Sequence, residues 1–147
     1  MTIHDNKRVV RRFIEEVINT GNADALADFI SPDCRESNDP TGKAVGLDSM
    51  RAHVLGVRQT YPDLCLTIEQ QIAEGDWVAT RVTARGTHRG AWLGIAPTGK
   101  PVTITGVNLD RVVNGRIIEH GGAANMLEAL LAIGAVRVVG SPPEEIA

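Results

Sequence analysis

The chain has 147 residues, of which 43% are hydrophobic and 22% are charged, and its formal net charge at pH 7 is −3. This composition is typical of one globular domain and argues against intrinsic disorder. The slight acidic excess gives no electrostatic footprint for nucleic acid or for an anionic membrane surface, so we expect neither partner. No apolar run approaches the ~20 residues of a membrane span, and the first residues do not resemble a signal peptide. We therefore expect a soluble, cytoplasmic protein.

The numbers of cysteine and aromatic residues limit the kinds of metal, disulfide and ligand-binding site that the chain can form. The two cysteines, Cys34 and Cys65, are too few for a disulfide framework or a zinc cluster. Aromatic residues make up only 3% of the chain, so a ligand site must be walled mainly by aliphatic and small side chains. This favours a preformed apolar cavity with a few polar groups.

The first part of the chain predicts helices. Apolar residues recur at helical spacing in three segments, residues 9–18, 22–30 and 47–61. Between the second and third segments, residues 31–46 are rich in Pro, Gly, Asp and Asn, which predicts a loop that includes a short strand at 34–36.

After Pro62 the period changes to the alternation of β-strands. Strands are predicted at residues 64–74, 77–88, 102–113 and 116–121. A short helix follows at 125–133. The domain is expected to cover residues 1–134, with 135–147 as a partly disordered C-terminal extension.

Helices followed by antiparallel strands predict the α+β class. A long curved antiparallel sheet folded around the N-terminal helices would leave a cone-shaped interior. A small molecule would bind in that interior, so we expect a small apolar substrate as partner.

The turn at Asn114-Gly115 predicts a hairpin register, because a type I′ turn needs positive φ at both central positions. In a regular two-residue hairpin, Asp110 lies opposite Glu119 and Asn108 lies opposite Gly121. Carboxylates directly across a strand pair repel, and burial would raise one pKa toward the range useful for general acid or base catalysis. The alternative is that both carboxylates face solvent and pair with arginines, for which the candidates are Arg81, Arg85 and Arg111.

The same register places His120 on the opposite face from Glu119, where it is either a structural hydrogen-bonding residue or a functional one. No pair of histidines and acidic residues has the spacing of metal ligands, so we expect no metal site. The chain also lacks a phosphate-binding loop and a dinucleotide fingerprint, so no cofactor is indicated.

Four ordered segments, together with the closing Leu-rich helix, resemble the SnoaL-like polyketide cyclases over nearly the whole chain to about Gly134. These segments are Asn19-Thr20-Gly21-Asn22, Tyr61-Pro62-Asp63-Leu64, residues 86–100 with the sequence Gly-Thr-His-Arg-Gly at their start, and residues 111–120. The resemblance implies a cone-shaped α+β barrel, as in ketosteroid isomerase, scytalone dehydratase and limonene epoxide hydrolase. It also implies a homodimer packed through the outer face of the sheet, and a deep apolar pocket that uses no metal or cofactor. The implied chemistry is an intramolecular aldol closure driven by a carboxylate acid/base.

Carried over residue by residue, the family's acid/base Asp falls at Gly122 and its preceding His falls at Asn108. Many relatives have Trp at Gly121, Asp at Asn125 and His at Asn38.

Three hypotheses follow. In the first, the protein is a cofactor-independent cyclase or isomerase with Asp110 or Glu119 as the acid/base, or a cyclase that mainly pre-folds its substrate. Substrate-binding groups in this hypothesis are Asn108, Asn125, Asn38 and His120, with Gly121 and Gly122 widening the cavity. In the second, the protein is a non-catalytic binding module that has lost the base. In the third, it is an epoxide-opening or hydrolytic enzyme on the same fold.

Overall fold

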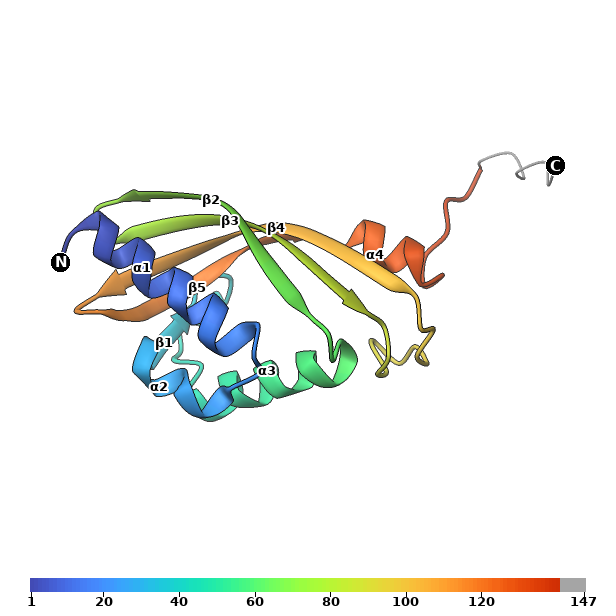
Figure 1. The fold of residues 1–147 in the computed structure, drawn as a ribbon, viewed down its shortest axis with the longest axis horizontal. Helices are drawn as coiled ribbons and strands as arrows, with labels where there is room; N and C mark the ends of the chain where they lie inside the picture. The colour runs from blue at the N-terminus through green and yellow to red at the C-terminus, as the bar shows by residue number, and fades with distance from the viewer. Residues whose placement is uncertain (141–147) are drawn as a thin grey trace.

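The computed structural model describes residues 1–140 and shows N-terminal helices packed against one curved sheet (Figure 1). The helical elements are α1 (Ile3–Phe13), which continues as the π-helical turn η1 (Ile14–Ile18), the short η2 (Ala23–Ala25), α2 (Leu26–Phe29), α3 (Leu47–Thr60) and α4 (Leu127–Ala132). The strands are β1 (Ile30–Glu36), β2 (Cys65–Glu74), β3 (Trp77–Thr87), β4 (Pro101–Val113) and β5 (Arg116–Asn125).

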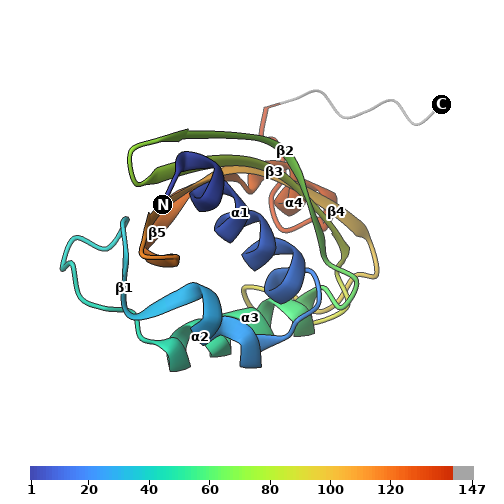
Figure 2. The same ribbon diagram turned by 60° about the vertical axis from the view of Figure 1, so that its left-hand side comes forward.

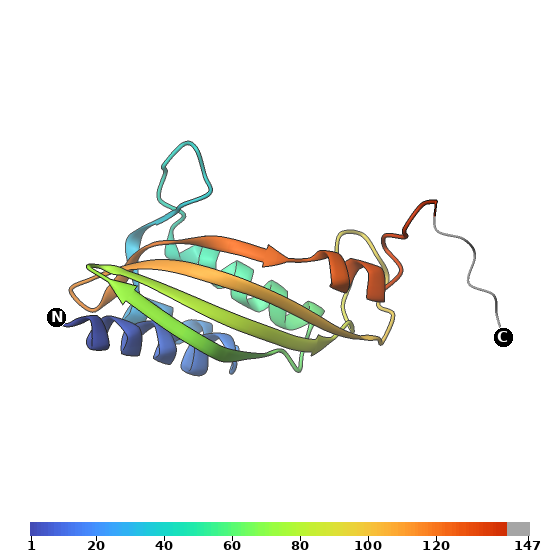
Figure 3. The ribbon, with the colours of Figure 1, turned by 90° about the horizontal axis from the view of Figure 1, so that it is seen from above.

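The sheet has the strand order β1-β5-β4-β3-β2, in which β1 runs parallel to β5 and the other neighbours are antiparallel. It is open, with β1 and β2 as its edges, and it curves around α1 (Figure 2). The α+β class with helices inside a curved sheet is therefore confirmed. Seen from above, the strands run side by side over the helices, and the loop between β1 and α3 projects beyond the sheet (Figure 3).

Helix α1 begins at a capping box, in which Asp5 N–H donates to Thr2 Oγ1 at 3.1 Å and Thr2 N–H donates to the Asp5 carboxylate at 3.0 Å. The end of η1 is tied to the sheet by Asn19, whose side-chain amide donates to the Leu66 carbonyl and accepts from the Leu66 N–H. These contacts fix the helix axis along the hollow of the sheet.

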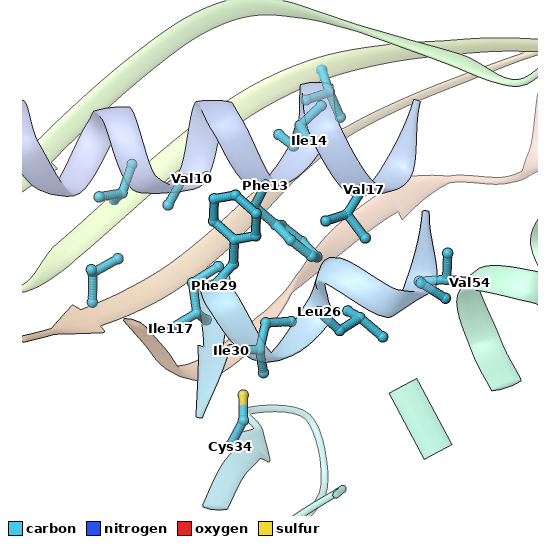
Figure 4. Close-up of a cluster of buried hydrophobic side chains, with 14 residues drawn as sticks. Val10, Phe13, Ile14, Val17, Leu26, Phe29, Ile30, Cys34, Val54 and Ile117 are labelled. Atoms are coloured by element: carbon cyan, nitrogen blue, oxygen red, sulfur yellow. The ribbon is translucent and has the colours of Figure 1, made fainter. Parts of the chain in front are cut away.

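The main core lies between α1, α2 and the inner side of the sheet (Figure 4). Val10, Phe13 and Val17 of the helical stripe meet Phe29 and Ile117 there. A second, smaller cluster closes the other end of the sheet around Tyr61, Leu64, Val102, Ala129 and Ile133.

Several element boundaries differ from the sequence prediction. The first helix begins at Ile3 and not near residue 9. Strand β1 covers residues 30–36 rather than 34–36, and its Pro32 is tolerated because β1 is an edge strand. Strand β5 runs to Asn125 rather than Gly121, so α4 begins later than predicted.

The β4–β5 hairpin contains a bulge that changes its register. Val113 pairs with Arg116 as expected, but the register shifts between Arg111 and Val112, and Ile118 becomes the extra residue of β5. Beyond the bulge Asp110 lies opposite His120, and Asn108 lies opposite Gly122. The predicted pairs Asp110–Glu119 and Asn108–Gly121 are therefore wrong, because a one-residue slip moves every later β5 side chain to the other face.

The chain after α4 is described to residue 140. Ala135 N–H donates to the Leu130 carbonyl at 2.9 Å, and Ala135 packs on the second cluster. The domain boundary at residue 134 stays a prediction. The rest of the expected C-terminal extension, residues 141–147, lies outside the described residues. Within residues 1–140 no helix is long and apolar enough to cross a membrane.

Candidate active site

A cavity of about 460 Å³ lies between the helices and the inner face of the sheet. Most of its wall is apolar and comes from η1, α2, α3 and the start of β2, including Ile14, Leu26, Val54, Val57 and Leu66. The sheet side is polar, because Glu36 of β1, Asn108 and Asp110 of β4 and His120 of β5 line it. The cavity thus has an apolar side formed mainly by helices and a polar side formed by the sheet.

Asp110 and His120 form a hydrogen-bonded pair on that wall. Their facing atoms, Asp110 Oδ1 and His120 Nδ1, are 2.6 Å apart, and Asp110 is only 1% exposed. The bulge makes the pair possible, since it places His120 directly across the strands from Asp110. The predicted register put His120 on the opposite face from Asp110, and that placement is therefore wrong, whereas His120 and its neighbour Glu119 do lie on opposite faces.

The pair favours a protonated imidazole. Burial acts to lower the pKa of His120, but the hydrogen bond and charge of Asp110, with a smaller effect of Glu36, outweigh it and raise that pKa above its ordinary value. Because Nδ1 is directed at Asp110, Nε2 is the other donor of the ring. Within residues 1–140, Nε2 has no protein hydrogen bond, and it is not among the buried polar atoms that lack a partner. It is therefore accessible from the cavity that the ring lines.

Glu36 extends this polar wall onto a third strand. In the parallel β1–β5 pairing Glu36 lies beside His120, so Glu36, His120 and Asp110 form one row across β1, β5 and β4. Glu36 Oε1 accepts a long hydrogen bond, 3.4 Å, from the Asn38 N–H. In the described part of the chain, no three His, Cys, Asp or Glu side chains are arranged to hold a metal ion, so this row is not a ligand set.

Asn108 completes the wall two residues before Asp110, on the same face of β4. Its side chain forms no hydrogen bond with residues 1–140, which leaves its amide free to donate to a ligand in the cavity. Cys34 is also at the cavity but is unreactive, because burial and the nearby Asp110 charge raise the pKa of its thiol to about 11.

Three predicted site residues lie elsewhere. Glu119 sits opposite Arg111 and accepts from Ser37 Oγ at 3.1 Å, and it does not line the cavity. Asn38 donates to the Gly122 carbonyl at 3.1 Å, and Asn125 accepts from the Leu127 N–H at the start of α4. These side chains link loops and strand ends, so the structure corrects their predicted placement in the site.

The two glycines do not widen the cavity as expected. Gly122 has φ of 140°, and a Cβ there would lie 2.1 Å from the Val107 carbonyl oxygen. A Cβ at Gly121 would lie 2.7 Å from Ser37 Cβ. Both positions need glycine because neighbouring chain segments approach closely, and with this backbone an aspartate has no room at position 122.

Glu36 is a carboxylate at the cavity that sequence reasoning missed. The predicted strand at 34–36 already put Cys34 and Glu36 on one face, and this alternation was the available signal. Their neighbours could not be known from it, because β1 pairs with a strand some eighty positions away in the chain.

Comparison with known proteins gives consistent results. The family described as SnoaL-like polyketide cyclase matches residues 8–133. The aklanonic acid methyl ester cyclase AcmA of Streptomyces galilaeus is 32% identical over 113 residues, covering 76% of this chain and 78% of AcmA. The nogalonic acid methyl ester cyclase of Streptomyces nogalater is 31% identical over 104 residues, covering 69% of this chain and 78% of that protein.

Among solved structures, the crystal structure of AclR from Streptomyces galilaeus superposes with a TM-score of 0.82. It is 28% identical, and the match covers 94% of this chain and 86% of AclR. Because the family model matches residues 8–133 and a relative is 32% identical over 76% of the chain, the chain belongs to the SnoaL-like polyketide cyclase family.

Proposed function

We propose that this protein is a cofactor-independent cyclase or isomerase that acts on an apolar, polyketide-like carbonyl compound. The observation that carries the proposal is the Asp110–His120 pair on the wall of an otherwise apolar cavity. Family membership supports the substrate class, since two of the relatives named above are cyclases of aklanonic acid methyl ester and nogalonic acid methyl ester.

His120 acts in this proposal as the acid. A protonated ring donates from Nε2 to a substrate carbonyl oxygen, stabilises negative charge as it develops there, and then transfers the proton to the alkoxide. Asp110 orients the ring and keeps it protonated, and the free Asn108 amide supplies a second donor. The apolar wall holds the substrate folded, so that proximity supplies a large part of the rate.

The chemistry must use residues other than those implied by the family resemblance. Position 122 cannot carry an acid/base side chain with this backbone, and Asn108 replaces the expected histidine. In this proposal the acid on that cavity wall is His120, held by Asp110, in place of a side chain at position 122 or 108.

The test is turnover of aklanonic acid methyl ester and nogalonic acid methyl ester by the purified protein, followed by chromatography and mass spectrometry for cyclised isomers. His120→Gln should reduce kcat by about 10²- to 10⁴-fold, the range expected for loss of a general acid, with KM nearly unchanged. His4→Gln, in α1 and away from the cavity, is the matched control and should keep full activity. Tight binding of both esters without turnover would favour the non-catalytic binding module, and conversion to a hydrolysed product would favour the hydrolytic alternative.

We also propose a cytoplasmic homodimer packed through the outer face of the sheet. The cytoplasmic location is supported by the free state of Cys34 and Cys65, which is typical of a reducing compartment. The dimer is supported by the exposed apolar side chains of Val107 and Leu109 on the outer side of β4.

A further inference from the structure

We propose that Glu36 is the base of this site, the group that takes a proton from substrate carbon while His120 serves as the acid. This inference rests on the proposed function and assigns its missing step. It starts from the distribution of carboxylates around the cavity.

Two carboxylates among residues 1–140 line the cavity, those of Asp110 and Glu36. Asp110 is 1% exposed, and its Oδ1 is held by His120 at 2.6 Å. The Asp110 carboxylate is therefore already engaged by the imidazole that it orients. Glu36 is only half-buried, and its one side-chain hydrogen bond within the described residues is the 3.4 Å contact from the Asn38 N–H. It is therefore the carboxylate with freedom to meet a ligand.

The position of Glu36 relative to the acid follows from the sheet. Parallel pairing of β1 with β5 places Glu36 beside His120, on the side away from Asp110. The two carboxylates thus flank the imidazole from neighbouring strands, one buried and one open. Glu36 and His120 both line the cavity, so a substrate bound there can contact both side chains.

The other charged groups at the cavity do not compete for this role. The Arg58 guanidinium donates to the backbone carbonyls of Ile18, Pro62 and Leu64 at 2.7 to 3.1 Å, so it is occupied as a structural clamp. Arg35 also lines the cavity, and its guanidinium cannot act as a base. His53 lines the cavity from α3, on the helical side, and not beside His120 on the sheet. Cys34 stays a neutral thiol.

The resulting cycle balances in atoms and charge. The Glu36 carboxylate takes the proton from carbon next to a substrate carbonyl, and the C–H electron pair forms an enolate whose oxygen accepts from Asn108. The enolate carbon attacks a second carbonyl, a C–C bond forms, and the new alkoxide takes the proton from His120 Nε2. Return of the proton from Glu36 to His120 through water restores both groups, so the net reaction is an isomerisation without oxidant or reductant.

Hydrogen exchange separates the two roles. Wild-type protein is incubated in D₂O with aklanonic acid methyl ester, and mass spectrometry follows both deuterium uptake at the acidic carbon and cyclisation. Glu36→Gln should lose both readouts by at least 10²-fold, whereas His120→Gln should lose cyclisation but retain exchange. Glu36→Asp keeps the carboxylate and should restore part of the exchange. Glu119→Gln is the matched control, since it removes a carboxylate of β5 that lies outside the cavity.

The outcomes distinguish this inference from the function on which it rests. An active wild type together with a Glu36→Gln variant that exchanges and cyclises at the wild-type rate would overturn the role of Glu36 and leave the proposed function standing. Wild-type protein that neither exchanges nor cyclises either ester would overturn both. Ligand binding by calorimetry, with circular dichroism of each variant, shows whether a loss of activity reflects chemistry or unfolding, and Glu36→Asp gives a second variant should Glu36→Gln fail to fold.

Discussion

Asp110 meets His120, rather than Glu119, because β5 carries one extra residue between Ile117 and Glu119. The bulge turns a predicted pair of repelling carboxylates into a carboxylate–imidazole pair. It also sends Glu119 to Ser37 and away from the cavity. One inserted residue therefore decides which side chains face the cavity.

Asp110→Asn should separate the orientation of His120 from its charge. The amide oxygen of the substituted side chain can still accept a hydrogen bond from Nδ1. The substitution removes the negative charge that raises the pKa of His120. In the proposed mechanism His120 is the acid, so activity should fall as pH rises through that pKa, and this alkaline limb should move to lower pH in Asp110→Asn. The measurement is kcat against pH for wild type, Asp110→Asn and Glu119→Gln. An alkaline limb at the same pH in all three would contradict the assignment.

The same pair should make stability depend on pH. The pKa of His120 is raised in the folded state, so its stabilising effect is fully present below the unfolded value near 6.5 and is lost as pH rises through the folded value. The free energy of unfolding of wild type, minus that of His120→Gln, should therefore decrease from about pH 6 upward. Urea denaturation at a series of pH values measures it. His4→Gln, compared in the same way, should show no such trend.

The helices and four of the strands could be predicted because each leaves a local hydrophobic period in the sequence. The fold class followed from the order of these elements along the chain. Residues 9–18 carry a helical stripe, and Val10, Phe13 and Val17 of that stripe are buried as the spacing implies. The Asn114-Gly115 turn was also correct, with positive φ at both residues.

The candidate site could be predicted only in part, because it depends on register and on long-range pairing. Asn108 and Asp110 were expected at the cavity and do line it. The adjacent Ile117 and Ile118 interrupt strict alternation, but two isoleucines in a strand do not reveal by themselves which one is extra. Glu36 reaches the site through a parallel pairing across the chain, which no local pattern encodes.

A dimer through the outer sheet face should depend on Leu109. This side chain is 41% exposed on β4, beside the exposed Val107. Leu109→Lys places a charge in the proposed contact and should convert a dimer to a monomer in light scattering coupled to size exclusion. Leu55→Lys is the matched control, because Leu55 is equally exposed, at 41%, on α3. The proposed interface is wrong if Leu109→Lys leaves the mass of a dimeric wild type unchanged.

Tyr61→Phe should be neutral or slightly stabilising. The Tyr61 hydroxyl is buried and has no hydrogen-bond partner among the described residues, so removing it deletes a desolvated polar atom and leaves the ring packing intact. Thr98→Val provides the contrast, because Thr98 Oγ1 lies 3.0 Å from Nδ1 of the buried His88, and its loss should cost about 1 kcal/mol. Thermal and urea unfolding compare the two. A loss of stability in Tyr61→Phe as large as that in Thr98→Val would show that the hydroxyl has a partner, such as a buried water.

Gly122→Ala should be among the most damaging small substitutions in the sheet. Its added Cβ would lie 2.1 Å from the Val107 carbonyl oxygen and 3.0 Å from Asn108 Cα, so β4 and β5 must separate where the cavity wall begins. We expect a loss of about 3 kcal/mol or more, or no folded protein. Gly99→Ala is the control, since Gly99 also has positive φ, +69°, but no atom within 4 Å of its Cβ position, and it should cost about 1 to 2 kcal/mol. Gly122→Asp, which restores the acid that the family resemblance implies, should then fail to fold or lose activity. A stable, more active Gly122→Asp variant would mean that the backbone here can adopt the relatives' arrangement, and that the Asp110–His120 pair is not the chain's sole route to acid/base chemistry.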